Sequence, residues 1–318
     1  MRALGFFEFG GPDALQVVDL PEPHPEPGEV RIRVHAATVN PTDTGLRAGR
    51  NPDRLAGLPA PHVPGMDLAG VVSEVGDGTA WRVGDPVMAM VVPLRAAGGA
   101  YADQVVLPAG SLAAVPAGAD FVAAATLPMN GLTARLTLDQ LALAPGQTLA
   151  VTGAAGAYGG YVVQLAKADG LRVVADAAEA DEALVRQLGA DEVVRRGDDV
   201  ADRIREIVPG GVDGLADGAV MNELVVPAVR DGGGLAVVRG WDGTTDRGIG
   251  DRGITVHRIW VSKMDGDGAA LDRPRQQADA GIVTLRVARV FTAAQAADAH
   301  RLLEAGGTRG RIVLDFSD

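Results

Sequence analysis

The chain has 318 residues, of which 47% are hydrophobic and 22% are charged, so it holds enough apolar material for two domain cores. Its net charge of -12, with lysines and arginines scattered along the chain, argues against nucleic acid as a partner. The absence of cysteine excludes disulfides, thiolate nucleophiles and every zinc site that uses cysteine.

The amino-terminal segment lacks the basic stretch followed by an apolar run that marks a secretory signal. No apolar run approaches the roughly 20 residues that a membrane-spanning helix needs. We therefore expect a cytoplasmic protein that does not associate with a membrane.

Short β-rich runs separated by proline and glycine fill the first part of the chain. This texture predicts a curled, mostly antiparallel β domain over residues 1–120. We expect its strands at residues 30–34, 68–75, 86–92 and 101–107.

From residue 121 the chain alternates between helical and strand patterns, which implies a parallel sheet with crossover helices over residues 121–262. A β-rich run at 254–261 is expected to end this sheet and leave an open edge. Residues 263–318 are expected to return to the first domain. The other expected strands of the parallel sheet lie at 148–152, 171–175, 191–194, 212–216 and 235–238, with helices at 158–167, 181–188 and 200–208.

A phosphate-binding turn is predicted where the strand at 148–152 runs into a helix through Gly153-Ala154-Ala155-Gly156-Ala157-Tyr158-Gly159. Small residues let the backbone approach a pyrophosphate, and the helix N-terminus offers N–H groups and partial positive charge. The alternative is that a helix merely packs closely on a strand. The residues expected over the pyrophosphate are Ala155, Gly156, Ala157, Tyr158 and Gly159.

Asp176 ends the next strand, about twenty residues further on, where a carboxylate would accept hydrogen bonds from the adenosine ribose. A carboxylate there repels the 2′-phosphate of NADPH, and Glu179 and Asp181 add to that field, whereas Arg172 is the only base nearby in sequence. We therefore predict NADH over NADPH. The alternative role for Asp176 is to cap a turn or the following helix.

An ordered set of segments resembles the zinc-independent quinone oxidoreductase branch of the medium-chain dehydrogenase/reductases. The resemblance implies an α/β fold with a GroES-like, mostly antiparallel β domain and a doubly wound Rossmann domain, and it implies a homodimer formed at the 254–261 edge. The matching segments are residues 39–43, 64–72, 84–87, 127–134, 153–159 and 307–311.

The positions similar to the zinc ligands of metal-dependent relatives carry Asn40, Met66-Asp67 and Met129, and the five histidines show no paired ligand spacing. These residues cannot form the soft tetrahedral site that zinc chemistry needs, so we expect no metal. Without a Lewis acid, an electrophilic acceptor is required. The resemblance thus implies metal-free hydride transfer from NAD(P)H to a quinone or an α,β-unsaturated carbonyl.

The resemblance also implies roles for single residues. Asn40 should lie beside the nicotinamide and Thr133 near the ribose or phosphates of the cofactor, while Asn40 and Asp43 are the candidate catalytic residues. The alternatives are turn chemistry before Pro41 for Asn40 and a helix cap for Asp43. The loop expected to flank the nicotinamide is Val238, Arg239 and Gly240.

Two features bear on the acceptor. Gly45 stands where close quinone reductases often carry an aromatic residue, so Tyr101 and Trp241 are the aromatic candidates for the cleft. An enoyl-thioester reductase or a biosynthetic tailoring reductase is the alternative enzyme, although the sequence shows no basic patch for a carrier phosphate. A non-catalytic, dinucleotide-binding structural or regulatory protein is the alternative of another class.

Overall fold

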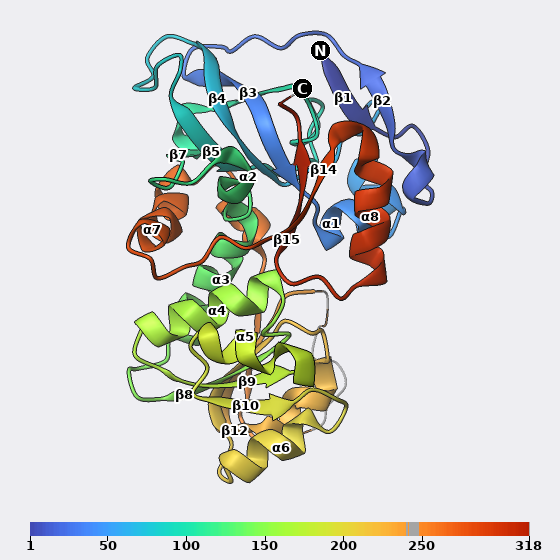
Figure 1. The fold of residues 1–318 in the computed structure, drawn as a ribbon. Coiled ribbons are helices and arrows are strands. Elements are labelled where there is room, and N and C mark those ends of the chain that lie inside the picture. The colour runs from blue at the N-terminus through green and yellow to red at the C-terminus, as the bar shows by residue number, and fades with distance from the viewer. Residues whose placement is uncertain (240, 242–247, 318) are drawn as a thin grey trace. The chain divides into compact units, whose positions relative to one another are not determined.

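The computed structural model describes residues 1–239, 241 and 248–317 (Figure 1). Its chain forms two compact units. The first unit comprises Met1–Met129, Ser262–Ala280 and the chain from Leu285 to the end of the described residues; the second comprises the described part of Asn130–Val261 together with Gly281–Thr284. Thr284 belongs to the second unit because its backbone N–H and its hydroxyl both donate to Oε1 of Gln164, at 3.0 and 2.9 Å.

A mixed sheet of seven strands forms the first unit, and β14–β15 is its only parallel pair among the described residues. The sheet order is β14 (Val287–Thr292), β15 (Arg311–Asp315), β3 (Glu29–Thr38), β4 (Asp67–Val75), β5 (Pro86–Met90) and β7 (Leu112–Ala114), with β6 (Gln104–Pro108) paired to β3. A separate antiparallel pair is formed by β1 (Arg2–Gly5) and β2 (Gln16–Asp19). The helices of this unit are α1 (Pro41–Arg47), α2 (Phe121–Ala124), α7 (Gly268–Asp279) and α8 (Ala296–Ala305).

Buried side chains alternate with more exposed ones along β3, and the buried side chains face the core of this unit. Val30, Ile32 and Val34 are fully buried, which is the period of two that a half-covered strand shows. The predicted mostly antiparallel β domain is confirmed. The β1–β2 pair and β7 were not predicted, because they are only three or four residues long and lie among proline and glycine.

Six parallel strands form the sheet of the second unit, in the order β10 (Glu192–Arg195), β9 (Arg172–Ala177), β8 (Thr148–Thr152), β11 (Val212–Asp217), β12 (Val229–Val237) and β13 (Thr255–Arg258). β8 is the first strand of this sheet along the chain, and the direction of winding reverses between β8 and β11. Ligands of open α/β sheets bind at such a switch point, outside the carboxyl ends of the strands. The helices are α3 (Pro128–Leu141), α4 (Ala157–Ala168), α5 (Glu182–Gln187) and α6 (Val200–Ile207). The predicted doubly wound domain is confirmed (Figure 1).

Some element boundaries differ from the sequence-based expectations. The strand expected at 254–261 is only β13, which is the edge strand of its sheet as predicted, and a 3₁₀ helix follows at Val261–Met264. Asn222–Ala228 is a 3₁₀ helix that contains Pro227, which cannot donate a helical hydrogen bond. Among the described residues, no helix combines the length and the apolar character that crossing a bilayer requires.

Candidate functional site

The glycine-rich turn joins β8 to α4 in the second unit. Gly153 has a φ of +68°, a backbone conformation that favours glycine, and Gly156 is the N-cap of α4. A Cβ on Gly159 would lie 2.3 Å from the carbonyl oxygen of Gly153 and 2.8 Å from its carbonyl carbon. Only glycine at position 159 therefore lets α4 sit this close to the turn, which leaves the helix N-terminus beside the end of β8.

Asp176, at the end of β9, fastens this turn. Its side chain is buried, and its Oδ1 accepts a hydrogen bond from the N–H of Ala154 at 3.2 Å. Burial raises the pKa of Asp176, while hydrogen bonds from the backbone of Ala154 and Gly153 oppose that rise. Asp176 thus caps the glycine-rich turn, as in the alternative role considered for it, and its side chain lies beside that turn.

The carboxyl ends of β8 and β11 are tied by a second buried carboxylate, Asp217. Its Oδ1 accepts from the hydroxyl of Thr152 at 2.7 Å, and its Oδ2 accepts from the N–H of Asn222 at 2.7 Å. Sequence reasoning missed Asp217, although a carboxylate directly after the apolar run 212–216 was the available signal. These contacts fix the two strands that flank the switch point.

Two other predicted residues, Tyr158 and Thr133, both contact the hydroxyl of Thr137. The hydroxyl oxygens of Tyr158 and Thr137 are 2.8 Å apart, and burial raises the pKa of Tyr158. The carbonyl of Thr133 accepts from the hydroxyl of Thr137 at 2.8 Å, so α3 and α4 are joined through these residues. Tyr158 therefore contributes its backbone to the turn, while its side chain packs inside the unit.

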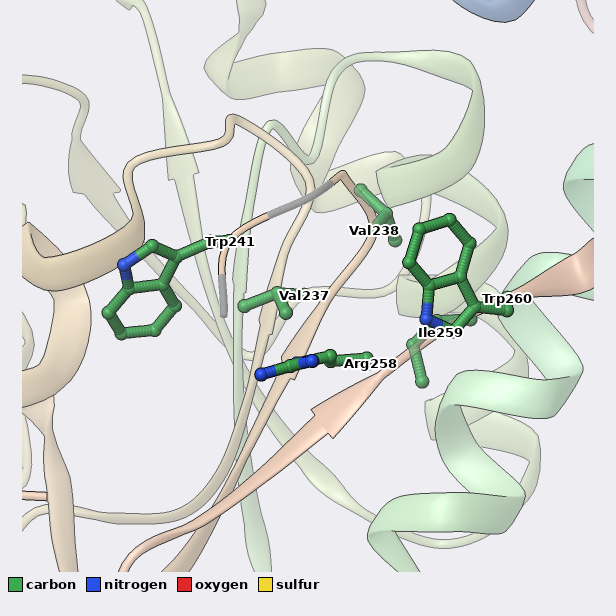
Figure 2. Close-up of a pocket in the computed structure, with 6 residues that line it drawn as sticks. All are labelled: Val237, Val238, Trp241, Arg258, Ile259 and Trp260. Carbon is green, nitrogen blue, oxygen red and sulfur yellow. The ribbon is translucent and has the colours of Figure 1, made fainter. Parts of the chain in front are cut away.

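A pocket of about 280 Å³ opens at the carboxyl ends of β12 and β13 (Figure 2). Val238 lines it, as does Trp241, an aromatic candidate from the sequence; Arg239 is described, and Gly240 lies outside the described residues. Trp260 was missed, although it stands two residues after β13. The lining residues are Val237, Val238, Trp241, Arg258, Ile259 and Trp260.

A second pocket, of about 330 Å³, lies at the carboxyl ends of β9 and β10. Arg195 ends β10 and lines this pocket, whereas Arg172 is the first residue of β9 and lies at the opposite end of the strands. Arg195, and not the Arg172 that proximity in sequence indicated, thus stands at the carboxyl ends of these strands. The lining residues are Ala177, Ala178, Glu179, Glu182, Val193, Val194 and Arg195.

In the first unit, Asn40 and Asp43 cap α1. Oδ2 of Asp43 accepts from the N–H of Asn40 at 2.8 Å, and its Oδ1 accepts from the N–H of Gly65 at 3.0 Å. The capping role considered for Asp43 is therefore present. Nδ2 of Asn40 donates to Oδ2 of Asp67 at 2.9 Å, while its Oδ1 is buried without a hydrogen-bond partner among the described residues.

Asp67 joins four segments of the chain and is fully buried. Besides Asn40, its carboxylate accepts from the hydroxyl of Thr38 at 2.7 Å, from Nη2 of Arg311 at 2.6 Å and from the N–H of Met129 at 2.6 Å. Three of the four positions similar to zinc ligands, namely Asn40, Asp67 and Met129, are thus linked by hydrogen bonds to the carboxylate of Asp67. The buried guanidinium of Arg311 supplies the charge that balances Asp67.

Tyr101 does not have the exposed ring that an acceptor platform needs. Its side chain is buried in the core of the first unit, and its hydroxyl lies 3.3 Å from Nε2 of His300 and 3.5 Å from Oδ2 of Asp43. Burial, together with the charge of Arg47, lowers the pKa of His300 to about 3. The pair therefore belongs to the internal structure of this unit.

The buried carboxyl of Asp43 predicts a pH effect on stability. Burial raises the pKa of Asp43 to about 7, with a smaller contribution from Asp67. The folded protein then binds a proton that the unfolded chain releases near pH 4, so this group favours folding at low pH and its contribution is lost between about pH 4 and 7. His300 acts with the opposite sign between about pH 3 and 6.5, because it stays neutral in the folded protein.

In the wild type, Asp43 and His300 have opposite effects on how the free energy of unfolding changes with pH, so they partly cancel. Asp43→Asn removes one of the two effects, and we therefore expect its pH profile of stability to differ from that of the wild type. The variant should gain stability relative to wild type as the pH rises from 4 to 7, by up to about 1.4 kcal/mol per unit. Urea unfolding at several pH values measures this. Parallel profiles for the two proteins would show that Asp43 is ionised throughout the range.

Comparisons with known proteins place the chain in a family. Residues 26–117 match the family "Alcohol dehydrogenase GroES-like domain", and residues 188–314 match "Zinc-binding dehydrogenase". The chain is 37% identical over 197 residues to the quinone oxidoreductase of Rattus norvegicus, in an alignment that covers 61% of this chain and 58% of that relative. A crystal structure of an NAD-dependent alcohol dehydrogenase is 31% identical, with a TM-score of 0.89 over the whole of both chains.

A full-length relative decides the assignment. The 2-haloacrylate reductase of a Burkholderia species is 33% identical over 328 aligned positions, which cover 96% of each chain. The matches to both family domains agree with this similarity. The protein therefore belongs to the quinone oxidoreductase-like branch of the medium-chain dehydrogenase/reductases, a family of oxidoreductases.

Proposed function

We propose that this protein is an NAD(P)H-dependent oxidoreductase that reduces a quinone or an α,β-unsaturated carbonyl compound without a metal ion. The observation that carries the proposal is the turn in which Gly153 and Gly159 leave no room for a side chain, at the switch point of a doubly wound sheet. Relatives named quinone oxidoreductase and 2-haloacrylate reductase support the two acceptor classes.

The residues of the second unit fit a dinucleotide. The backbone of residues 155–159 would hold the pyrophosphate at the N-terminus of α4, Asp176 would face the adenosine ribose and Thr133 the central part of the cofactor. Val238 and Arg239 follow β12 and would flank the nicotinamide. The bound cofactor supplies the hydride, and the chain supplies binding, orientation and a site shielded from water.

We propose a metal-free site because of the chemistry of the donors. Asp67, the one carboxylate among the zinc-like positions, is already engaged by Arg311 and by three further donors. Asn40 uses its amide N–H on that carboxylate, and the thioethers of Met66 and Met129 are poor zinc ligands. A group of three or more His, Asp or Glu side chains close enough to bind a metal does not occur among the described residues.

Asn40 is the proposed catalytic residue of the first unit, as the resemblance implies. Its buried Oδ1 has no partner among the described residues, so this carbonyl is ready to accept a hydrogen bond. Asp43 positions it, because the carboxylate holds the backbone N–H of Asn40 at 2.8 Å. The chain then acts by orienting the reactants, with an acceptor that carries its own electrophilic carbon.

We further propose NADH as the preferred cofactor, a cytoplasmic location and a homodimer. The acidic residues around the end of β9 support the first, since Asp176, Glu179 and Glu182 repel an added phosphate. The dimer would form through β13, the edge strand of the parallel sheet. A solution mass of one chain would contradict it.

The test is consumption of NADH and of NADPH with a panel of quinones, enones and one enoyl thioester. We expect turnover with quinones or enones, a higher kcat/KM with NADH and no loss of activity after dialysis against a chelator. Turnover confined to the thioester would favour the other enzyme class. Nucleotide binding with no turnover of any acceptor would favour a non-catalytic protein.

A further inference from the structure

A further inference rests on the proposed function and concerns how the chain distinguishes NADH from NADPH. The two cofactors differ only in a phosphate on the 2′-oxygen of the adenosine ribose. In a doubly wound sheet this oxygen lies at the carboxyl end of the second strand, which is β9 here. The selecting groups must therefore stand around the end of β9.

Asp176 alone does not account for selection. Its side chain is only 6% exposed, and its Oδ1 faces back to the N–H of Ala154 in the turn. A carboxylate held in this way stabilises the turn, and it contributes little to the repulsion of a phosphate on the 2′-oxygen. The charges that point outward belong to neighbouring residues.

Those charges line the pocket of about 330 Å³ at the ends of β9 and β10. Arg195 stands opposite Ala177 in the parallel register of the two strands. Its Nη1 lies 3.1 Å from Oε2 of Glu179, while the side chains of Arg195 and Glu179 are 58% and 82% exposed. A second carboxylate, Glu182, lines the same pocket.

An exposed ion pair of this kind adds little to folding stability. It does change what the pocket offers to a ligand, because a guanidinium is the side chain best suited to grip a phosphate. As long as Glu179 holds Arg195, that guanidinium is neutralised, and the carboxylate itself repels a dianionic phosphate. Without Glu179 the same pocket would present a free cation.

We propose that the Glu179–Arg195 ion pair is the selectivity device of this chain, and that it masks a site for the 2′-phosphate of NADPH at the ends of β9 and β10. The pair lowers the affinity for NADPH and leaves that for NADH nearly unchanged. Glu179 is thus a specificity-determining residue that acts through Arg195.

The test compares Glu179→Gln with a matched control, Glu192→Gln. Glu192 pairs with Arg172 across the same two strands, at 3.8 Å and with similar exposure, but at their amino ends, away from the nucleotide. We expect Glu179→Gln to lower the Kd for NADPH about tenfold, as removal of one nearby charge implies, and the Kd for NADH to change less than about twofold. Glu192→Gln should match the wild type for both.

A second measurement isolates the adenosine end. Adenosine 2′,5′-bisphosphate and 5′-AMP differ only in the 2′-phosphate, and Glu179→Gln should bind the former more tightly than the wild type does. The double variant Glu179→Gln/Arg195→Gln should lose this gain, because the guanidinium of Arg195 is then absent.

The inference fails if the ratio of the two cofactor affinities changes no more in Glu179→Gln than in Glu192→Gln, or if the double variant keeps the gain. These outcomes leave the proposed function intact, because both nucleotides still bind. A wild-type protein that binds neither NADH nor NADPH would contradict the proposed function and this inference together.

Discussion

Replacing Gly159 with alanine is expected to weaken NADH binding roughly thirty- to hundredfold, the equivalent of about 2 to 3 kcal/mol. The added Cβ would stand 2.3 Å from the carbonyl oxygen of Gly153 and 2.9 Å from the Cα of Ala154. Both neighbours are backbone atoms and cannot rotate away, so α4 must move off the turn. The N–H groups at its N-terminus then no longer converge on the pyrophosphate.

Gly210 provides the control for this variant. It lies in the same unit, between α6 and β11, and a Cβ there would meet nothing within 4 Å. Gly210→Ala should therefore bind NADH like the wild type. Fluorescence titration with NADH measures both variants, and circular dichroism verifies that each is folded. Wild-type affinity in Gly159→Ala would show that the turn does not hold the cofactor.

The parts of the fold that sequence predicted are those with strong local patterns. The strand at 148–152 was predicted with its observed bounds, because a short apolar run that leads into a glycine-rich turn marks it in the sequence. The two-domain α/β architecture, with one mostly antiparallel and one parallel sheet, followed from alternation of elements along the chain. Short elements such as β7, with three residues, carry too little pattern to be found.

The parts of the site that sequence missed depend on which strands become neighbours. Arg195 reaches the pocket beside Glu179 because β10 pairs with β9, whereas proximity along the chain indicated Arg172. Tyr101 meets His300 across 199 residues, so its choice as an exposed aromatic could not be judged from local sequence. Composition and periodicity predict which residues form strands and helices and which of them are buried. They do not predict the order of strands in a sheet.

The pair Asp67–Arg311 joins residues 244 positions apart and leads to the second large expected effect. Asp67→Asn keeps the shape of the side chain but removes the charge that balances a guanidinium only 4% exposed. We expect it to lower the free energy of unfolding by about 3 to 5 kcal/mol, because the other charge stays buried without compensation.

An exposed pair in the same unit serves as the control. Asp298 pairs with Arg301 on α8 at 2.7 Å, with 62% and 45% of the two side chains exposed. Asp298→Asn should cost at most about 1 kcal/mol in urea unfolding. The double variant Asp67→Asn/Arg311→Gln should recover part of the loss, since it removes both buried charges. If Asp67→Asn were no more destabilising than Asp298→Asn, the stability of the buried network would not depend on the charge of Asp67.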